Sequence, residues 1–351
     1  MVYYKKIREI CLLNIIALAL AAAPMVFAGT ETVIDQDAAY KYKRQTPEQA
    51  FARQTTTPND LHTDLTVGIA QGIDTNPLLD STHKADTYTQ ETLDMRFKYK
   101  LPENSLGKLD SRFGFNIFNI NYYKSTDVNI FDGVADINFD QQLSEHLTAT
   151  VGYALETMWF PNDRNGNYLG NEISAGFKQD LTKSIYQRVV YRLQFRNYLD
   201  RKAMLGNGNF MSDLRFDIRN TFRHELGVYI GKKIKLRVID DLIVNNSNDQ
   251  FFDFYDYNAY RTGGSLVAMF TGKLYGTAGL YYQRKWYYSR IVSAGDYPQR
   301  DNLYTAAASL TYEITKNLSI FANYTHMENH SNEPLEQYID TLCYGGFNYA
   351  F

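Results

Sequence analysis

The sequence predicts an all-β fold, a transmembrane antiparallel up-and-down β-barrel of about 14 strands. Three observations support this. Apolar and polar residues alternate over long stretches, and the connections between those stretches are alternately short and long. Beyond residue 28 no apolar run approaches the ~20 residues that a membrane helix needs. Aromatic residues make up 15% of the 351 residues although the mean hydropathy is negative, so apolar and polar side chains must be finely interleaved.

The overall charge excludes some classes of partner. Lys and Arg total 36 against 39 Asp and Glu, a net charge of −3, which argues against nucleic acid as a partner. Cys11 and Cys343 cannot build a disulfide framework, and we expect Cys343 to be a small packing residue. No motif asks for a cofactor, and we expect none.

The first 60 residues predict an export signal followed by an arm. Lys5, Lys6 and Arg8 precede an apolar stretch from Cys11 to Ala23, and small residues lead to a cleavage site after Ala28. Residues 1–28 are therefore predicted to be a signal peptide, since the apolar stretch is short for a membrane anchor. Residues 29–60 are polar and are predicted to form a periplasmic arm or, alternatively, a plug that enters the barrel.

Residues 61–351 are predicted to form the barrel. Between residues 93 and 101, for example, Leu93, Met95 and Phe97 alternate with Asp94 and Arg96. A period of two over ten or so residues indicates a strand with one apolar and one polar face, long enough to cross a bilayer at a tilt. The predicted strands are 61–72, 86–101, 109–123, 129–143, 147–160, 170–181, 185–199, 210–230, 234–247, 254–270, 273–289, 301–315, 318–328 and 337–351.

The connections predict how the barrel sits in its membrane. Short turns at 143–147, 181–185 and 314–318 repeat one form, an aliphatic residue, a hydroxyl residue, two polar residues and another aliphatic residue. Longer segments rich in Asn, Asp and Gly, such as 161–170 and 199–209, lie between the short turns. Short periplasmic turns that alternate with longer outer loops are typical of bacterial outer-membrane barrels.

The last residues carry a resemblance to a known class. Phe347, Tyr349 and Phe351 alternate up to the end of the chain, and in this they resemble bacterial outer-membrane β-barrel proteins. The segment Gly72–Leu78, with its Asp-x-Asn-Pro sequence, is similar to the opening of porin-like barrels and of barrel domains of surface-export proteins. The resemblance implies the outer membrane of a Gram-negative cell, with lipid, lipopolysaccharide and the barrel-assembly machinery as partners. Phe347, Tyr349 and Phe351 would be the assembly signal.

If the apolar row of each strand faces lipid, the polar row faces the lumen. A basic wall and an acidic wall are then predicted on opposite sides of the pore, and a transverse field would favour anions near the basic wall. Alternatively, these charges form a structural ion-pair network that fills a narrow lumen. The predicted basic residues are Arg188, Arg192, Arg196, Arg215, Arg219, Arg223, Lys235 and Arg237, and the predicted acidic residues are Asp94, Asp132, Asp136 and Asp140.

One place breaks the predicted lipid-facing row. If a three-residue turn pairs Ile230 with Ile234, His224 lies directly across from Asp240 on that face. A charge that faces lipid is costly, so three interpretations follow in order of preference. The pair is turned inward by a β-bulge, it contacts another subunit, or it is an external catalytic dyad.

Other candidate sites are weaker. His326, Glu328 and His330 offer metal ligands by type, but we interpret them as solvated rim residues and predict no metal site. Aromatic residues cluster at the outer strand ends and are interpreted first as a girdle at the membrane interface, second as stacking platforms for sugars. They are Phe251, Phe252, Phe254, Tyr255, Tyr257, Trp286, Tyr287 and Tyr288.

The favoured functional hypothesis is a channel for small polar or anionic solutes, not an enzyme, and possibly a homo-oligomer. The first alternative is a plugged barrel that assists export or surface display of a protein or polysaccharide. The second is an outer-membrane hydrolase that uses His224 and Asp240.

Overall fold

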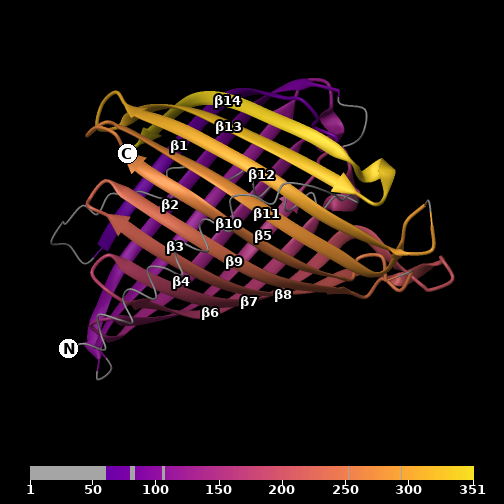
Figure 1. The fold of residues 1–351 in the computed structure, drawn as a ribbon, viewed down its shortest axis with the longest axis horizontal. Coiled ribbons are helices and arrows are strands. Elements are labelled where there is room, and N and C mark those ends of the chain that lie inside the picture. The colour runs from indigo at the N-terminus through magenta and orange to yellow at the C-terminus, as the bar shows by residue number, and fades with distance from the viewer. Residues whose placement is uncertain (1–60, 80–83, 105–106, 252, 294) are drawn as a thin grey trace, which may run out of the picture.

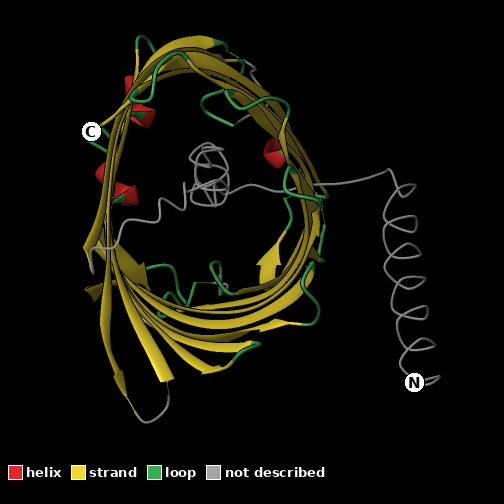
Figure 2. Cartoon of the chain, turned by 90° about the vertical axis from the view of Figure 1, so that its left-hand side faces the viewer, coloured by secondary structure: helices red, strands yellow, loops and turns green. Residues whose placement is uncertain are grey.

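The computed structural model is a closed antiparallel β-barrel of fourteen strands. It describes residues 61–351 apart from 80–83, 105–106, 252 and 294, and the predicted signal peptide and arm lie outside this part. Each strand pairs with the next along the chain, and β1 pairs with β14 to close the ring (Figures 1 and 2). The strands are β1 (Leu61–Asp74), β2 (Asp86–Asn104), β3 (Gly107–Tyr122), β4 (Ile130–Ser144), β5 (Leu147–Trp159), β6 (Tyr168–Asp180), β7 (Ile185–Met204), β8 (Phe210–Ile230), β9 (Ile234–Ser247), β10 (Tyr257–Met269), β11 (Leu274–Ile291), β12 (Pro298–Glu313), β13 (Leu318–Ser331) and β14 (Tyr338–Ala350).

The predicted fold class, strand number and order of strands are confirmed. The bounds of β8 and β9 agree with the prediction at both ends, whereas β7 runs five residues beyond the predicted end at 199. Those extra residues of β7 still pair with β8, with a register shift after Asn197. A shifted register breaks the simple alternation of side chains, so a period of two does not detect this extension.

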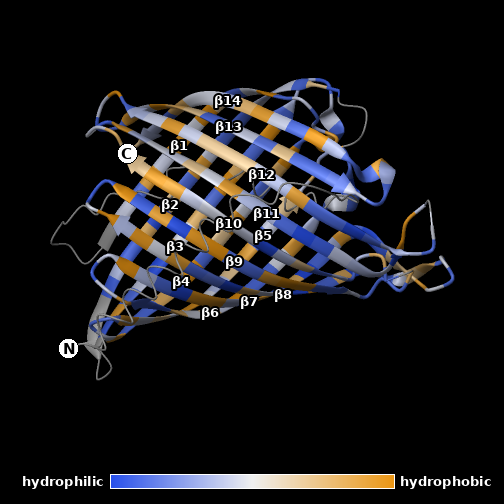
Figure 3. Cartoon of the chain, viewed as in Figure 1, coloured by the Kyte–Doolittle hydropathy of each residue, from blue (hydrophilic) through white to orange (hydrophobic). Residues whose placement is uncertain are grey.

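The alternation along each strand separates an outer row from an inner row of side chains. Val151, Tyr153 and Leu155 of β5 are 56%, 43% and 38% exposed, while Gly152 and Glu156 between and beside them are buried. Figure 3 shows the same banding on neighbouring strands. Among the described residues, no helix has the length and apolar character needed to cross a membrane. The exposed apolar outer row is the surface that a barrel presents to hydrocarbon.

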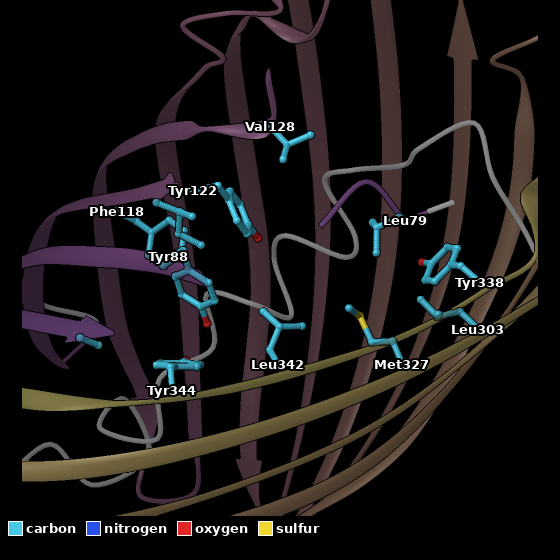
Figure 4. Close-up of a cluster of buried hydrophobic side chains, with 12 residues drawn as sticks. Leu79, Tyr88, Phe118, Tyr122, Val128, Leu303, Met327, Tyr338, Leu342 and Tyr344 are labelled. Carbon is cyan, nitrogen blue, oxygen red and sulfur yellow. The ribbon is translucent and has the colours of Figure 1, made fainter. Parts of the chain in front are cut away.

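The hydrophobic core of the described chain lies inside the barrel, on the inner row. Its largest cluster joins the first three strands to the last three and includes Tyr88, Tyr122, Met327, Leu342 and Tyr344 (Figure 4). Rings of Tyr88 and Tyr122 lie 5.3 Å apart at an interplanar angle of 54°. Aromatic side chains and aliphatic side chains therefore fill one side of the lumen.

The Asp-x-Asn-Pro segment after β1 holds the first loop against this cluster. Asn76 is fully buried, its backbone N–H donates to Oδ1 of Asp74 at 2.9 Å, and its side-chain amide donates to the carbonyl of Ile339 at 3.3 Å. Oδ1 of Asp340 accepts from the same backbone N–H at 3.1 Å, and Tyr122 donates to Oδ2 of Asp74 at 2.6 Å. The segment thus ties the loop between β1 and β2 to the last strand of the barrel.

Candidate functional site

The structure places all twelve charged residues predicted to face the lumen on the inner row. The register shows this directly, because Arg196 lies across from Asp217, Arg192 across from Thr221, and neither shares a row with the exposed apolar residues. The set is Arg188, Arg192, Arg196, Arg215, Arg219, Arg223, Lys235, Arg237, Asp94, Asp132, Asp136 and Asp140.

Many of these charges are paired with a neighbour on the same or the next strand. Nε of Arg223 lies 2.6 Å from Oδ1 of Asp241, and Arg261 of β10 binds the other oxygen of the same carboxylate. Nη2 of Arg96 lies 2.8 Å from Oδ2 of Asp94 in a two-residue span of β2. Local pairing of this kind is what the alternative interpretation, a structural ion-pair network, expects. It also weakens any field between separate walls, because each charge is offset nearby.

At the outer end of the lumen the balance of charge is different. A recess of about 590 Å³, including the open solvent at its mouth, is lined by six basic side chains and a single acidic one. Six lining residues are tyrosines or phenylalanines with their rings among these cations. The lining residues are Phe160, Asn165, Gly166, Tyr168, Arg196, Tyr198, Arg201, Arg215, Asp217, Arg219, Asn245, Tyr255, Tyr257, Lys285, Tyr287 and Arg290.

Aromatic rings hold the cations of the recess in place. The guanidinium carbon of Arg215 lies 4.2 Å from the ring centre of Tyr198 and 3.3 Å from that of Tyr255. Nζ of Lys285 lies 4.1 Å from the ring centre of Tyr257 and 4.8 Å from that of Tyr287. A ring face attracts a cation without cancelling its charge, so this arrangement orders positive groups and keeps the surface positive.

Two of the cations also form ion pairs. Arg215 donates through Nε and Nη2 to both oxygens of Asp217, and both side chains are nearly fully buried. Nη2 of Arg290 lies 2.9 Å from Oε1 of Glu336 in the loop before β14. Arg219 donates to the hydroxyl of Tyr257 at 2.7 Å and to Oδ1 of Asn245 at 3.3 Å. The recess is thus built from the loop between β5 and β6 and from β6 to β11, and its cations are held by contacts with several strands.

The loop between β9 and β10 completes the recess by delivering Tyr255. Asn245 donates to the carbonyl of Tyr255 at 2.9 Å, and the backbone N–H of Ser247 donates to Oδ1 of Asp256 at 2.6 Å. Burial in this loop raises the pKa of Asp256 to about 6, against the lowering effect of the Ser247 hydrogen bond, and the nearby Asp253 raises it further. The loop that positions Tyr255 therefore contains a carboxyl group, that of Asp256, whose pKa lies near neutral pH.

The girdle interpretation is wrong for Tyr257 and Tyr287. Both lie on the inner row of their strands, both are 5% exposed, and both line the recess. The alternation along the strand could have indicated this, because Tyr287 is two residues from the inward Lys285 on β11 and so shares its face. Tyr288 is 48% exposed on the outer row, where a girdle residue belongs. Tyr255 lies in a loop without alternation, and no sequence pattern places it in the recess.

The predicted pairing of His224 with Asp240 is confirmed. The β8–β9 hairpin pairs Ile230 with Ile234, and His224 lies directly across from Asp240. The first interpretation, an inward-turning bulge, is wrong because this register runs without a shift from Asp217 to Ile230. Both residues stay on the outer row, and Tyr260 of β10 donates to Oδ1 of Asp240 at 2.7 Å.

The three candidate metal ligands of β13, His326, Glu328 and His330, also lie on the outer row. Nε2 of His330 is 2.5 Å from Oε1 of Glu328, and Nδ1 of His326 is 2.9 Å from the hydroxyl of Thr341 on β14. Within the described residues, no group of three or more His, Cys, Asp or Glu side chains could hold a metal ion.

No protein-family model and no curated protein matches the sequence. Among solved structures, the barrel is similar to a loop-deleted OmpT, an outer membrane protein of Vibrio cholerae, with 9% identity, 84% of this chain and 100% of that chain covered, and a TM-score of 0.46. It is also similar to an anion-selective porin from Comamonas acidovorans, with 11% identity, 83% and 99% coverage and a TM-score of 0.44. A third is the translocator domain of the autotransporter NalP from Neisseria meningitidis, with 9% identity, 90% and 96% coverage and a TM-score of 0.36. These likenesses concern the fold alone.

The closed ring of strands, its exposed apolar outer row and its polar inner row together indicate a barrel that spans a membrane. Only a barrel without free edges satisfies its backbone in hydrocarbon by strand pairing. Long antiparallel strands joined by short turns at one end and longer loops at the other are the form of barrels in Gram-negative outer membranes. As the sequence predicts, the chain is a bacterial outer-membrane β-barrel protein.

Proposed function

We propose that the chain is an outer-membrane channel for small anionic solutes, which bind in the recess at the outer end of its lumen. The supporting observation is the lining of that recess, with six basic side chains and a single acidic one. A concave surface with one sign of charge and low-dielectric walls concentrates counter-ions. Cations held against aromatic rings need little reorganisation when an anion binds.

Planar-bilayer recording of the purified protein tests this function. We expect discrete conductance steps with a preference for chloride over potassium, and a current block when a multivalent anion such as citrate is added on the loop side. Substitution of the recess cations, Arg219→Gln with Lys285→Gln, should reduce both the anion preference and the affinity of the block several-fold.

A matched control uses cations outside the recess. Lys98 and Arg112 lie on inner rows of β2 and β3, where they pair with Asp110 and Asp140. The double substitution Lys98→Gln with Arg112→Gln removes the same charge and should leave the citrate block nearly unchanged. A protein that conducts no ions, or one in which both double variants weaken the block equally, would contradict the proposal.

A plugged barrel that assists export is the second candidate. It is favoured by the buried cluster that joins β1–β3 to β12–β14 within the lumen and by the buried loop residues Asn76 and Leu79. This candidate predicts no conductance in the same recording. It also predicts a neighbouring gene that encodes the exported cargo.

We assign no catalytic role to His224 and Asp240. Across three strands the outer row reads His224, Asp240 and Thr262, so the carboxylate lies between the imidazole and the hydroxyl. A serine-type triad needs the imidazole in the middle, in contact with the nucleophile. Here two strand spacings, about 10 Å, separate His224 from Thr262. Unchanged lipid composition on expression of the intact protein is the expected result.

A further inference from the structure

The outer row differs sharply between two sides of the barrel. On β3 to β9 it carries large apolar side chains, for instance Phe139, Ile173 and Leu242, which are 41%, 51% and 55% exposed. On β10 to β14 small residues are more frequent at the level of the bilayer, and they stand beside the exposed Leu266, Leu280, Leu310 and Tyr324. The small residues are Gly264, Ala268, Ala278, Ala306, Ala308, Ala322, Cys343 and Gly345, and the register pairs Ala278 with Ala308 and Ala322 with Gly345.

Polar side chains border this small-residue face on both sides. On one side lie His224, Asp240 and Thr262, one on each of β8, β9 and β10. On the other lies the hydrogen-bonded pair of His326 and Thr341. Asp240 accepts a hydrogen bond from Tyr260, while His224 forms no ion pair with Asp240 or any other carboxylate in the part of the chain that the structure describes.

The depth of the first border makes it costly in lipid. His224 and Asp240 each lie six residues from the turn that joins Ile230 to Ile234. At about 3.3 Å per residue and a tilt of about 40°, this is ~15 Å above the turn, near the middle of an apolar band ~25 Å tall. The exposed Leu181, Ile230 and Phe270 at the short turns mark the lower edge of that band. Ionisable groups at such a depth normally face protein or water rather than lipid.

We propose that this face, the outer row of β8 to β14 centred on Ala278 and Ala308, is an interface with a second copy of the chain in the membrane. Small side chains let two walls approach closely, which is how packing stabilises association where lipid removes the hydrophobic driving force. The two borders supply a carboxylate and a hydroxyl on one side and an imidazole and a hydroxyl on the other. A symmetric contact sets such borders of two copies against each other, so one surface complements itself. This inference does not depend on the proposed transport function.

Mass measurement of the protein in lipid nanodiscs tests the interface. We expect the wild type to be an oligomer and Ala308→Trp with Ala278→Trp to be largely monomeric, because two indoles keep the walls apart. Ala175→Trp is the matched control: Ala175 is an exposed outer-row alanine on β6, five residues from the end of its strand, as Ala308 is on β12. Retention of the heat-modifiable gel shift of a folded barrel shows that each variant has assembled.

A second variant separates an interface from a lipid-facing surface. His224→Leu with Asp240→Leu should raise the dissociation constant of the oligomer about tenfold if the pair lies between subunits. If the pair instead faces lipid, the same variant leaves the mass unchanged and unfolds at higher urea concentration. A monomeric wild type, an unaffected mass in the tryptophan double variant, or this lipid-facing outcome would overturn the proposal.

Discussion

Asp241 stands at the centre of the charge pattern on the inner wall. Its side chain is fully buried, and both oxygens accept hydrogen bonds from Nε and Nη2 of Arg223 at 2.6 and 2.9 Å. Arg261 binds the same carboxylate from the next strand. Removal of one partner from a buried pair leaves the other charge without compensation, and this costs more than the pair itself contributes.

We therefore expect Asp241→Asn to lower the free energy of unfolding by about 3 kcal/mol. Asp110→Asn is the matched control, because its partner Lys98 is 46% exposed and such a surface pair contributes less than about 1 kcal/mol. Urea titration of tryptophan fluorescence in lipid vesicles measures both. Equal effects of the two substitutions would show that Asp241 is as well solvated as Asp110.

Asp256 predicts a pH dependence of stability. Its pKa in the folded loop is raised by burial to about 6 from an ordinary value of 3.8, so the folded state prefers the neutral carboxyl group. The stability that this preference contributes is present at acid pH and is lost as the pH rises from about 4 through 6. The difference in unfolding free energy between wild type and Asp256→Asn should change between pH 4 and pH 7, in favour of the wild type at acid pH. A pH-independent difference would contradict this.

The loop after β1 links the first strand of the barrel to the last strand, β14. Asn76 donates to the carbonyl of Ile339, and its backbone N–H is shared by Asp74 and Asp340. Because Asn76 is fully buried, solvent does not reach its amide to replace these partners. The loop is held by β14 rather than by its own sequence neighbours alone.

Asn76→Ala should cost about 1–3 kcal/mol of unfolding free energy and speed amide exchange at Thr75, whose N–H donates to the carbonyl of Thr341. Asn121→Ala is the control, since Asn121 is exposed on the outer row and its amide reaches Glu91 at 3.4 Å. An unchanged rate of amide exchange at Thr75 in Asn76→Ala would argue against this link between the loop and β14.

Strand alternation explains what the sequence could and could not predict. A period of two assigns every strand residue to a row, so the fourteen strands, the inner charges and the pairing of His224 with Asp240 all follow from it. The same parity identifies Tyr257 and Tyr287 as inward, although the girdle interpretation overlooked it. The position of Asn76 depends on a contact with Asp340 far along the chain, and that of Tyr255 on a contact with Asn245 of the preceding strand; no local period encodes such contacts.

At the scale of the whole molecule, we expect the last residue, Phe351, to affect the yield of assembly but not the stability of the assembled barrel. Phe351 is 72% exposed, and its ring contacts Tyr349 at 4.9 Å while its N–H donates to Leu65. If it is an assembly signal, its deletion should reduce the amount of assembled barrel several-fold and change the unfolding free energy of the purified protein by less than about 1 kcal/mol. Leu335→Ala, which truncates a loop residue that is 71% exposed, should change neither quantity.

The fastening of the first loop to β14 has a consequence for the order of events during biogenesis. Asp340 follows Asn76 by 264 residues, so the groups that bury Asn76 do not exist until almost all of the chain has been synthesised. Until then β1 keeps an unpaired edge, and an open edge recruits strands from other chains. The β1–β14 pairing and the contacts of Asn76 with β14 form in the same late step. A chain truncated before residue 338 therefore has neither. Such fragments should be the aggregating, protease-sensitive species of this protein.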